Sequence, residues 1–320
     1  MAPSPTREHQ PTPINPISSM TEPWPSPAHL EAATNTHRQG AFVISSRKLP
    51  ISKAGPIEAM EKDLQIPVPE MIFGDNVVGI AHAPTGWRIE FNARDALDAV
   101  DKTGANMLQV AYAGEWSASR EQTSAGIREV VRPFDWSYST TYKGTVIHGL
   151  ADAADTAADN NNDNSTGAGG EDGNKRRRRS LDFTPTNEPI PIELLKRRDP
   201  IRFFDDVMLY ESELDDNGIS VLSVKLRVHD ERMLLLSRLY MRLDNVVCRV
   251  RDTRIYVDFA SEVVTREYTA KEAGFSDVKQ KLLISGLRPD AITVALRDAN
   301  RIAEVLPTVS QTLESVSLAA

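Results

Sequence analysis

The sequence predicts a single α+β domain made mainly of antiparallel β sheet with a few short helices. Apolar and polar residues alternate along residues 220–228, as in a strand with one buried face. Two pairs of apolar runs flank short turn-forming segments, Ala83–Gly86 and Asp244-Asn245, and each pair is typical of a hairpin. Residues 1–36 and 149–180 have compositions that do not support folding, which leaves about 200 residues for one core.

Composition limits the classes of function. The 320-residue chain has a net charge of −8 and a pI near 5.4, which argues against general binding of nucleic acid or of anionic membranes. Its one cysteine, Cys248, excludes an internal disulfide and fits a reducing compartment. Because no apolar run approaches about 18 residues and no signal peptide is visible, we expect a soluble protein of the cytoplasm and nucleus.

The N-terminal third begins with a proline-rich segment, residues 1–36, that we expect to be disordered because it has few apolar partners. Gly40–Ser46 is predicted as the first strand, and Pro56 opens a short helix that runs to about Leu64. A hairpin is expected over residues 77–92.

Asn92 can cap the helix that follows, which we expect to run through Asp95, Leu97 and Val100 and to end at Gly104. The alternation in Leu108–Tyr112 favours a strand, although the Ala-Gly-Glu-Trp-Ser segment after Tyr112 also fits a helix.

Four aromatic residues lie between Pro133 and Thr145 in a chain that is only 6% aromatic. Ser137–Thr145 is rich in β-branched and aromatic residues and is predicted as a strand, with Trp136 and Tyr138 as core anchors.

Residues 149–180 form an insertion rich in Ala, Asp, Asn and Gly, and we expect a disordered loop. The basic block Lys175–Arg179 at its end has three interpretations: a nuclear import signal, a kinase recognition site for phosphorylation of Ser180, or a solvated charge run.

The second half is predicted to be rich in strands. A short helix over Glu193–Arg198 ends before Pro200, and strands follow over 220–228, 233–243 and 246–251. If Leu243 pairs with Val246, the apolar residues Leu239 and Met241 lie opposite Val250 and Cys248, which makes Cys248 an inert buried thiol.

The same register gathers four arginines on the opposite face: Arg238, Arg242, Arg249 and Arg251. Like charges that face each other across strands need acidic partners. These partners are either internal, such as Asp205, Asp206, Glu262 or Glu267, or they belong to a bound anion, in which case the face is a binding surface.

Residues 276–320 are expected to hold one amphipathic helix over Ala291–Val305, ended by Pro307, and a frayed tail. The helix either docks on the domain or folds onto a partner.

The usual catalytic signatures are missing from the sequence. It has no Gly-Lys-Ser/Thr phosphate loop, no Gly-x-Ser-x-Gly elbow and no His-Glu-x-x-His pair, and no spacing of its histidines suggests a metal site. We therefore expect no catalytic residues and no cofactor. The alternative is a small-ligand enzyme or carrier that uses the mixed aromatic and arginine surface.

Several blocks in one order resemble the family of type 2A phosphatase regulators called TIPRL in animals. The blocks are Pro69–Val77, Ile89–Leu97, the aromatic run Pro133–Thr145, Phe203–Val207, Leu222–Val228, Asp252–Tyr256 and Arg266–Thr269. They lie within residues 37–275, which would form the family's phosphatase-binding domain around the insertion, in a fungal member.

This resemblance implies a non-catalytic protein, expected to be a monomer, that binds catalytic subunits of type 2A phosphatases and of their type 4 and type 6 relatives. It also implies a role in target-of-rapamycin signalling with an alpha-four-type regulator. The family's contact positions fall on Asp95, Ile190, Val250 and Asp252, although the register above places Val250 on an apolar face. Arg249 and Arg251 would suit the carboxylate of the phosphatase's acidic C-terminal tail.

Overall fold

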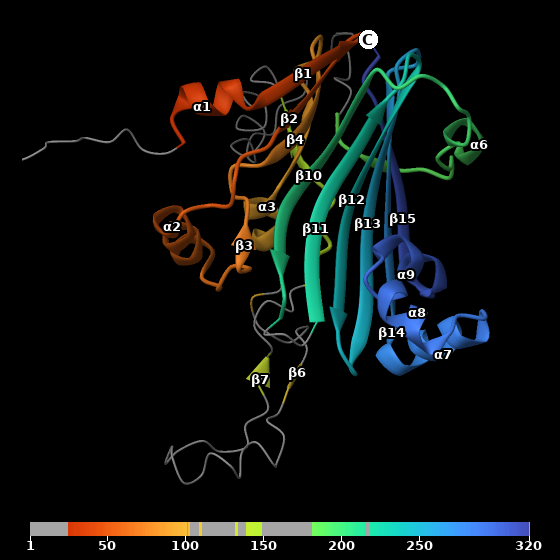
Figure 1. Cartoon of the computed structure of the whole chain (residues 1–320). Helices are drawn as coiled ribbons and strands as arrows, with labels where there is room; N and C mark the ends of the chain where they lie inside the picture. The colour runs from red at the N-terminus through yellow and green to blue at the C-terminus, as the bar shows by residue number, and fades with distance from the viewer. Residues whose placement is uncertain are drawn as a thin grey trace, which may run out of the picture.

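Two antiparallel β sheets lie against each other and form the body of the protein (Figure 1). The computed structural model describes residues 25–100, 102, 109–110, 132–133, 139–148, 181–214 and 218–319. The small sheet has the strand order β1-β2-β4-β5-β8, and the large sheet has the order β3-β10-β11-β12-β13-β14-β15-β9. The predicted fold class, α+β with mainly antiparallel sheet, is confirmed.

The elements have the following bounds. The small sheet contains β1 (Thr34–Gln39), β2 (Phe42–Arg47), β4 (Val77–His82), β5 (Arg88–Asn92) and β8 (Thr145–Ile147). The large sheet contains β3 (Met71–Ile72), β9 (Thr184–Pro185), β10 (Phe203–Ser212), β11 (Gly218–Val228), β12 (Arg232–Leu243), β13 (Val247–Asp258), β14 (Val263–Gly274) and β15 (Thr308–Ser317). The helices are α1 (Pro27–Ala32), α2 (Ala54–Leu64), α3 (Ala93–Asp98), α6 (Ile192–Leu195), α7 (Phe275–Ile284), α8 (Pro289–Ala295) and α9 (Ala299–Val305), and β6 (Gln109–Val110) pairs with β7 (Arg132–Pro133).

The central hairpin of the small sheet agrees with the prediction from sequence. The predicted hairpin over residues 77–92 is β4 and β5, closed by a turn in which the His82 amide donates to the Trp87 carbonyl at 2.8 Å. The Asn92 side chain accepts a hydrogen bond from the Asp95 amide and so caps α3, as predicted. That helix ends at Asp98, however, well before the predicted end at Gly104.

The N-terminal boundary needs a correction. Helix α1 and strand β1 occupy residues that the composition assigned to a disordered tail ending at residue 36. Strand β1 pairs with β2 along its whole length, so backbone hydrogen bonds to β2 stabilise a polar segment that has few apolar side chains of its own.

The main core lies between the two sheets. It joins Phe42 and Phe91 of the small sheet, and Trp87 of the β4–β5 turn, to Leu235 and Ile255 of the large sheet, and all five side chains are fully buried. The predicted alternation in β11 is confirmed, because the apolar side chains at positions 222, 224, 226 and 228 are buried in this core. We call this side of the large sheet the inner face.

The register between β12 and β13 differs from the prediction by one residue. Leu243 pairs with Val247, so the connection has three residues, and Asn245 adopts a left-handed φ of 61° within it. A three-residue hairpin loop with one left-handed residue is a common geometry. The one-residue slip reverses the faces: Arg238 now lies opposite Asp252, and Leu239 lies opposite Arg251.

The C-terminal region also differs from the prediction. The helix expected over residues 291–305 is split into α8 and α9, and α7 precedes them. The segment expected to be a frayed tail is the ten-residue strand β15, which pairs with β14 inside the large sheet.

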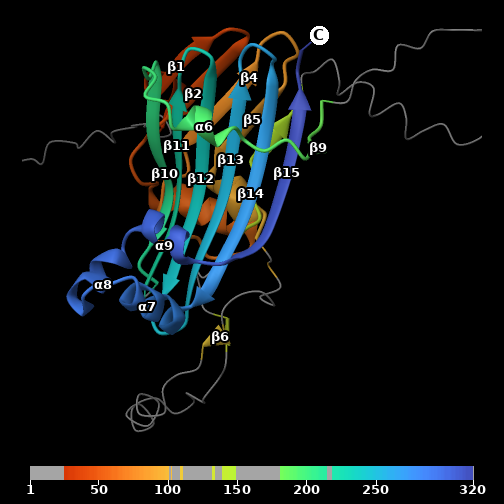
Figure 2. The ribbon, with the colours of Figure 1, turned by 90° about the vertical axis from the view of Figure 1, so that its right-hand side faces the viewer.

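Helices α7, α8 and α9 cover one end of the other side of the large sheet, which we call the outer face, while α6 lies over the opposite end (Figure 2). Tyr240, Cys248 and Val250 of the sheet form a second apolar cluster with Phe275 and Ile302 of these helices. The C-terminal helical segment therefore docks on the domain, which was one of the two expectations.

Other predictions have mixed outcomes. The expected strand over Ser137–Thr145 is wrong where it is described, because residues 141–144 are not strand and β8 begins at Thr145. Gln109 and Val110 lie in a strand, as the alternation there favoured. Trp136, Tyr138, the insertion 149–180 and the block Lys175–Arg179 with Ser180 lie outside the described residues.

Candidate functional site

The alternation along β13 sends the predicted partner-binding residues to two different faces. Val250 and Asp252 lie on the outer face, while Arg249 and Arg251 lie on the inner face with Leu239 and Met241 of β12. The prediction that a single face gathers the arginines 238, 242, 249 and 251 is therefore wrong.

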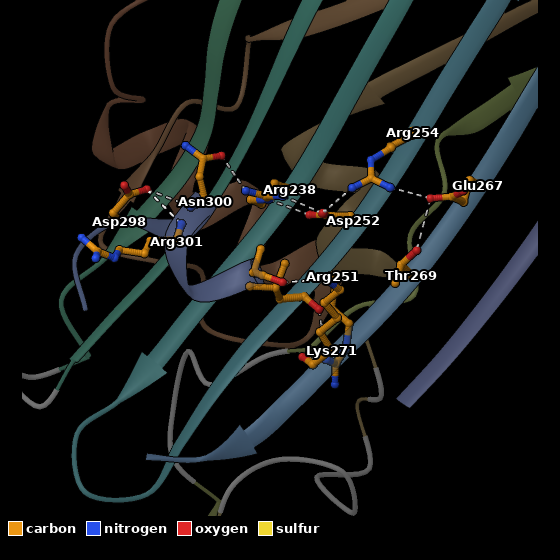
Figure 3. A network of polar contacts seen from close by, with 12 residues as sticks. Arg238, Arg251, Asp252, Arg254, Glu267, Thr269, Lys271, Asp298, Asn300 and Arg301 are labelled. Carbon is orange, nitrogen blue, oxygen red and sulfur yellow. Dashed lines mark hydrogen bonds and ion pairs between the residues drawn. The ribbon is translucent and has the colours of Figure 1, made fainter. Parts of the chain in front are cut away.

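A ladder of charged residues crosses the outer face between α6 and α9 (Figure 3). Arg238 donates from Nε and Nη2 to the two carboxylate oxygens of Asp252, both at 2.7 Å. Arg254 lies 3.7 Å from the same carboxylate and donates to Glu267 at 2.6 Å, and Glu267 also accepts from Thr269 at 3.5 Å. Opposite charges thus alternate across β12, β13 and β14, and each neutralises its neighbour.

Helix α9 is tied to this ladder by polar contacts. The Arg238 Nη1 donates to Asn300 Oδ1 at 2.7 Å, and the Lys271 Nζ donates to the Ala303 carbonyl at 2.6 Å. Asp252 is 2% exposed and Val250 is fully buried beneath the helices, so this arrangement presents neither side chain to solvent.

Two arginines share one carboxylate on the inner face. Arg249 donates to Glu272 at 2.6 Å and 3.3 Å, and Arg251 donates to Glu272 at 2.7 Å. Burial alone would raise the pKa of Glu272, but the hydrogen bonds from the two guanidinium groups outweigh it and hold the pKa below its usual value. The Arg249 Nη1 is buried without a hydrogen-bond partner among the described residues, so the trio has one surplus positive charge and one unused donor.

Asp95 connects α3 to the inner face. Its carboxylate accepts from Thr145 Oγ1 at 2.5 Å, and Thr145 shares a 3.0 Å hydrogen bond with the Tyr142 hydroxyl. Burial raises the pKa of Tyr142 to about 12. The Tyr142 carbonyl accepts from Thr253 on β13 at 3.0 Å. Thr253 lies two residues from Arg251, on the same face of β13.

Ile190 is 3% exposed and lies in the segment that leads into α6. Arg232, whose side chain is 4% exposed, holds that segment by donating to the Leu194 carbonyl at 2.8 Å and by an ion pair with Asp199. Ile190 therefore anchors the loop at one end of the outer face, while Val250 lies under the helices at the other end.

The four arginines have internal acidic partners, as one of the two interpretations held, but none of the four named candidates is among them; Glu267 pairs with Arg254 instead. The partners are Asp252 for Arg238, Asp244 for Arg242, and Glu272 for Arg249 and Arg251. Sequence reasoning missed Glu272 and Arg254, which form their ion pairs across β13 and β14. The three-residue loop at Asn245 accounts for the pairing of Arg238 with Asp252.

Other chemistry in the described parts of the chain is limited. Burial raises the pKa of the Cys248 thiol to about 12, in line with the predicted inert cysteine. Across residues 25–319, wherever the structure describes them, no group of three His, Cys, Asp or Glu residues is placed to hold a metal ion. No described helix is long and apolar enough to cross a membrane.

Comparison with known proteins decides the family. A family model described as "TIP41-like family" matches residues 71–279, which is more than half of the chain. The chain belongs to the TIP41-like family. The match runs from β3 into α7, so it includes the charged residues of β12–β14 on both faces and most of the core between the sheets. Strands β1 and β2 lie before it, and α8, α9 and β15 lie beyond it.

Curated relatives from distant organisms agree with this assignment. A TIP41-like protein of Dictyostelium discoideum is 36% identical over 281 residues, covering 87% of this chain and 91% of the relative. The human TIP41-like protein is 37% identical over 248 residues, covering 76% and 80%. A Saccharomyces cerevisiae protein named "Type 2A phosphatase activator TIP41" is 35% identical over 291 residues, covering 86% and 72%.

Proposed function

We propose that this protein regulates type 2A protein phosphatases by binding their catalytic subunit, without catalysing a reaction itself. The observation that carries the proposal is its similarity, along most of both chains, to a Saccharomyces cerevisiae relative whose name is that of a type 2A phosphatase activator. Binding both occupies a phosphatase and changes how much of it is free for other regulators, so activation and inhibition are both possible outcomes of mass action.

The inner-face trio supports a contact with an acidic segment of the phosphatase. Arg249, Arg251 and Glu272 retain one surplus positive charge, and Arg249 has an unused buried donor. The planar guanidinium group of an arginine can donate two parallel hydrogen bonds to one carboxylate. The proposed occupant is the acidic C-terminal tail of the catalytic subunit, which ends in a free carboxylate.

The outer ladder has a different role in this proposal. Asp252 is already held by two hydrogen bonds from Arg238, so it shapes the sheet and the position of α9 rather than meeting the partner directly. Asp95, through Thr145 and Tyr142, similarly positions the small sheet beside β13.

The wider cellular role is part of the same proposal. The phosphatases bound include the type 4 and type 6 relatives, and the protein acts in target-of-rapamycin signalling with an alpha-four-type regulator, as a monomer in the cytoplasm and nucleus. The acidic composition of the chain, with a net charge of −8, suits a protein that binds other proteins rather than nucleic acid.

Calorimetry with purified proteins tests the proposal. The protein alone should show no phosphatase activity, and it should bind both a type 2A catalytic subunit and a peptide of that subunit's C-terminal tail. Arg249→Ala should weaken binding of the peptide at least tenfold, because Arg251 and Glu272 then neutralise each other. The matched control is Arg254→Ala, since Arg254 is another sheet arginine that is paired with carboxylates, those of Glu267 and Asp252, but lies on the outer face.

Two results would count against the proposal. Failure of the wild-type protein to bind the catalytic subunit removes phosphatase binding altogether. If Arg249→Ala binds the tail peptide like wild type while melting at a lower temperature, Arg249 serves an internal ion pair and the inner-face trio is not the tail site.

A further inference from the structure

Helices α7 and α8 and the tip of the β12–β13 hairpin enclose a pocket of about 480 Å³. Its walls are the apolar side chains of Phe275, Leu283, Ile292 and Leu296. Clefts that bind ligands commonly measure about 300–1,000 Å³, so this pocket has room for one or two side chains of a partner.

The charges around the pocket are mainly positive. Arg242, Lys279 and Arg297 line it, with Asp244 as the one acidic lining residue. Asp244 is already neutralised, because it accepts from Arg242 Nε at 2.7 Å. That leaves Lys279 and Arg297, and in the C-terminal part that the structure describes neither makes an ion pair with a carboxylate.

Lys279 is held beside the apolar wall by a cation–π contact. Its ammonium lies 5.5 Å from the centre of the Phe275 ring, which keeps a positive charge beside the pocket although the residue is exposed. A local basic site of this kind stands out in a protein whose net charge is −8.

One apolar side chain at the rim of the pocket is exposed. Leu283, which lines the pocket, is 47% exposed. A small molecule enclosed by the pocket would leave much of this side chain in water, whereas a peptide that continues past the rim would cover it.

We propose that this pocket, with Leu283 at its rim, is a docking site for an acidic peptide segment of a partner protein. A large apolar side chain of the segment enters between α7 and α8, and flanking carboxylates pair with Lys279 and Arg297. The site is separate from the inner-face trio: Arg249, on the same strand as Cys248 and Val250, points to the opposite side of the large sheet.

The probe for the test is a fluorescein-labelled synthetic peptide that alternates glutamate with leucine and phenylalanine. Its matched partner carries lysine in place of every glutamate. Fluorescence anisotropy should show binding of the acidic peptide and at least tenfold weaker binding of the basic one. In methyl-labelled protein, the resonances of Leu283 and Ile292 should shift on titration with the acidic peptide.

Variants at exposed positions keep the test independent of folding. Lys279→Glu with Arg297→Glu should weaken binding of the acidic peptide at least tenfold, and Leu283→Ser should also weaken it. Arg301→Glu is the matched control, because Arg301 is an exposed cation on α9 that does not line the pocket. It should bind the acidic peptide like wild type.

Four outcomes would overturn the inference. Equal binding of the acidic and the basic peptide would show that Lys279 and Arg297 do not select acidic peptides. Equal binding of the acidic peptide by the Lys279→Glu/Arg297→Glu variant and by wild type would show the same. If the phosphatase tail peptide displaces the probe, the pocket belongs to the phosphatase site. If Leu283→Ser instead abolishes a concentration-dependent dimer seen by light scattering, a second copy of this chain covers the rim.

Discussion

Arg238 and Asp252 lie directly opposite each other on β12 and β13 and form a two-pronged ion pair, with both hydrogen bonds 2.7 Å long. The side chains are 11% and 3% exposed. Breaking such a buried pair by removing one partner leaves an uncompensated charge, whereas replacing both partners with apolar residues costs little.

Asp252→Ala should therefore lower the free energy of unfolding by about 3–5 kcal/mol, because Arg238 loses its partner while it remains buried. Arg238→Met together with Asp252→Leu should recover most of that loss. Urea unfolding of the single and double variants measures both effects. A loss of under about 1 kcal/mol for Asp252→Ala would place the pair among solvent-screened surface ion pairs.

Glu272 links stability to pH on the inner face. Its pKa is held below the value in an unfolded chain, which is about 4.3, so its contribution to stability is fully present above that value and is lost as the pH falls through the lower, folded pKa. Glu272→Gln should therefore lower the unfolding free energy at pH 7 and make a much smaller difference in acid. Unfolding curves at pH 7 and below pH 4, with the exposed Glu188→Gln as the control, check this expectation. An equal loss at both pH values would contradict it.

Gly144 precedes β8 with a left-handed φ of 90°. A β carbon there would lie 2.8 Å from Ile89 Cδ1 and Phe91 Cζ, which belong to the main core. Gly144→Ala should lower the unfolding free energy by about 1–3 kcal/mol through backbone strain and overpacking. Gly55→Ala in α2 is the control, since nothing lies within 4 Å of the added carbon and it should be neutral or slightly stabilising. Equal melting temperatures for the two variants would argue against the tight approach of Gly144.

Cys248 should not react with a thiol reagent in the folded protein. The side chain is fully buried and burial raises the pKa of its thiol to about 12, so almost no thiolate is present at pH 8. Absorbance with Ellman's reagent should show reaction only after urea unfolds the chain. Rapid reaction of the native protein would mean that α7–α9 readily leave the outer face.

Prediction from sequence succeeded where short-range patterns decide the structure. The β4–β5 hairpin, the Asn92 cap and the alternation of β11 each depend on residues that are close in the chain. For the same reason the α+β class was predictable.

The site was less predictable because one turn controls it. The Asp244-Asn245 pair suggested a two-residue loop, but Asn245 takes the left-handed conformation within a three-residue loop, and the side-chain period of two then moves every residue of β13 to the other face. Local sequence does not distinguish these loops. The packing of Cys248 and Val250 against α7–α9 favours the observed one, since the other would bury Arg249 and Arg251 there.

The sequence by itself determined the strand-rich class, the hairpins with clear turn signals and the family, since these follow from local pattern and residue identity. Tertiary structure alone decided that β1 and β15 are ordered strands, that α7–α9 cover Val250, and which carboxylate neutralises each arginine. Strands β1 and β15 are mostly polar, with 308–312 all exposed, so backbone hydrogen bonds to a neighbouring strand stabilise them rather than burial of their own side chains. Strand β15 depends on β14, a partner distant in the chain, which its own residues do not record. Strand β1 pairs with the adjacent β2, but its polar composition gives no sign that it is a strand.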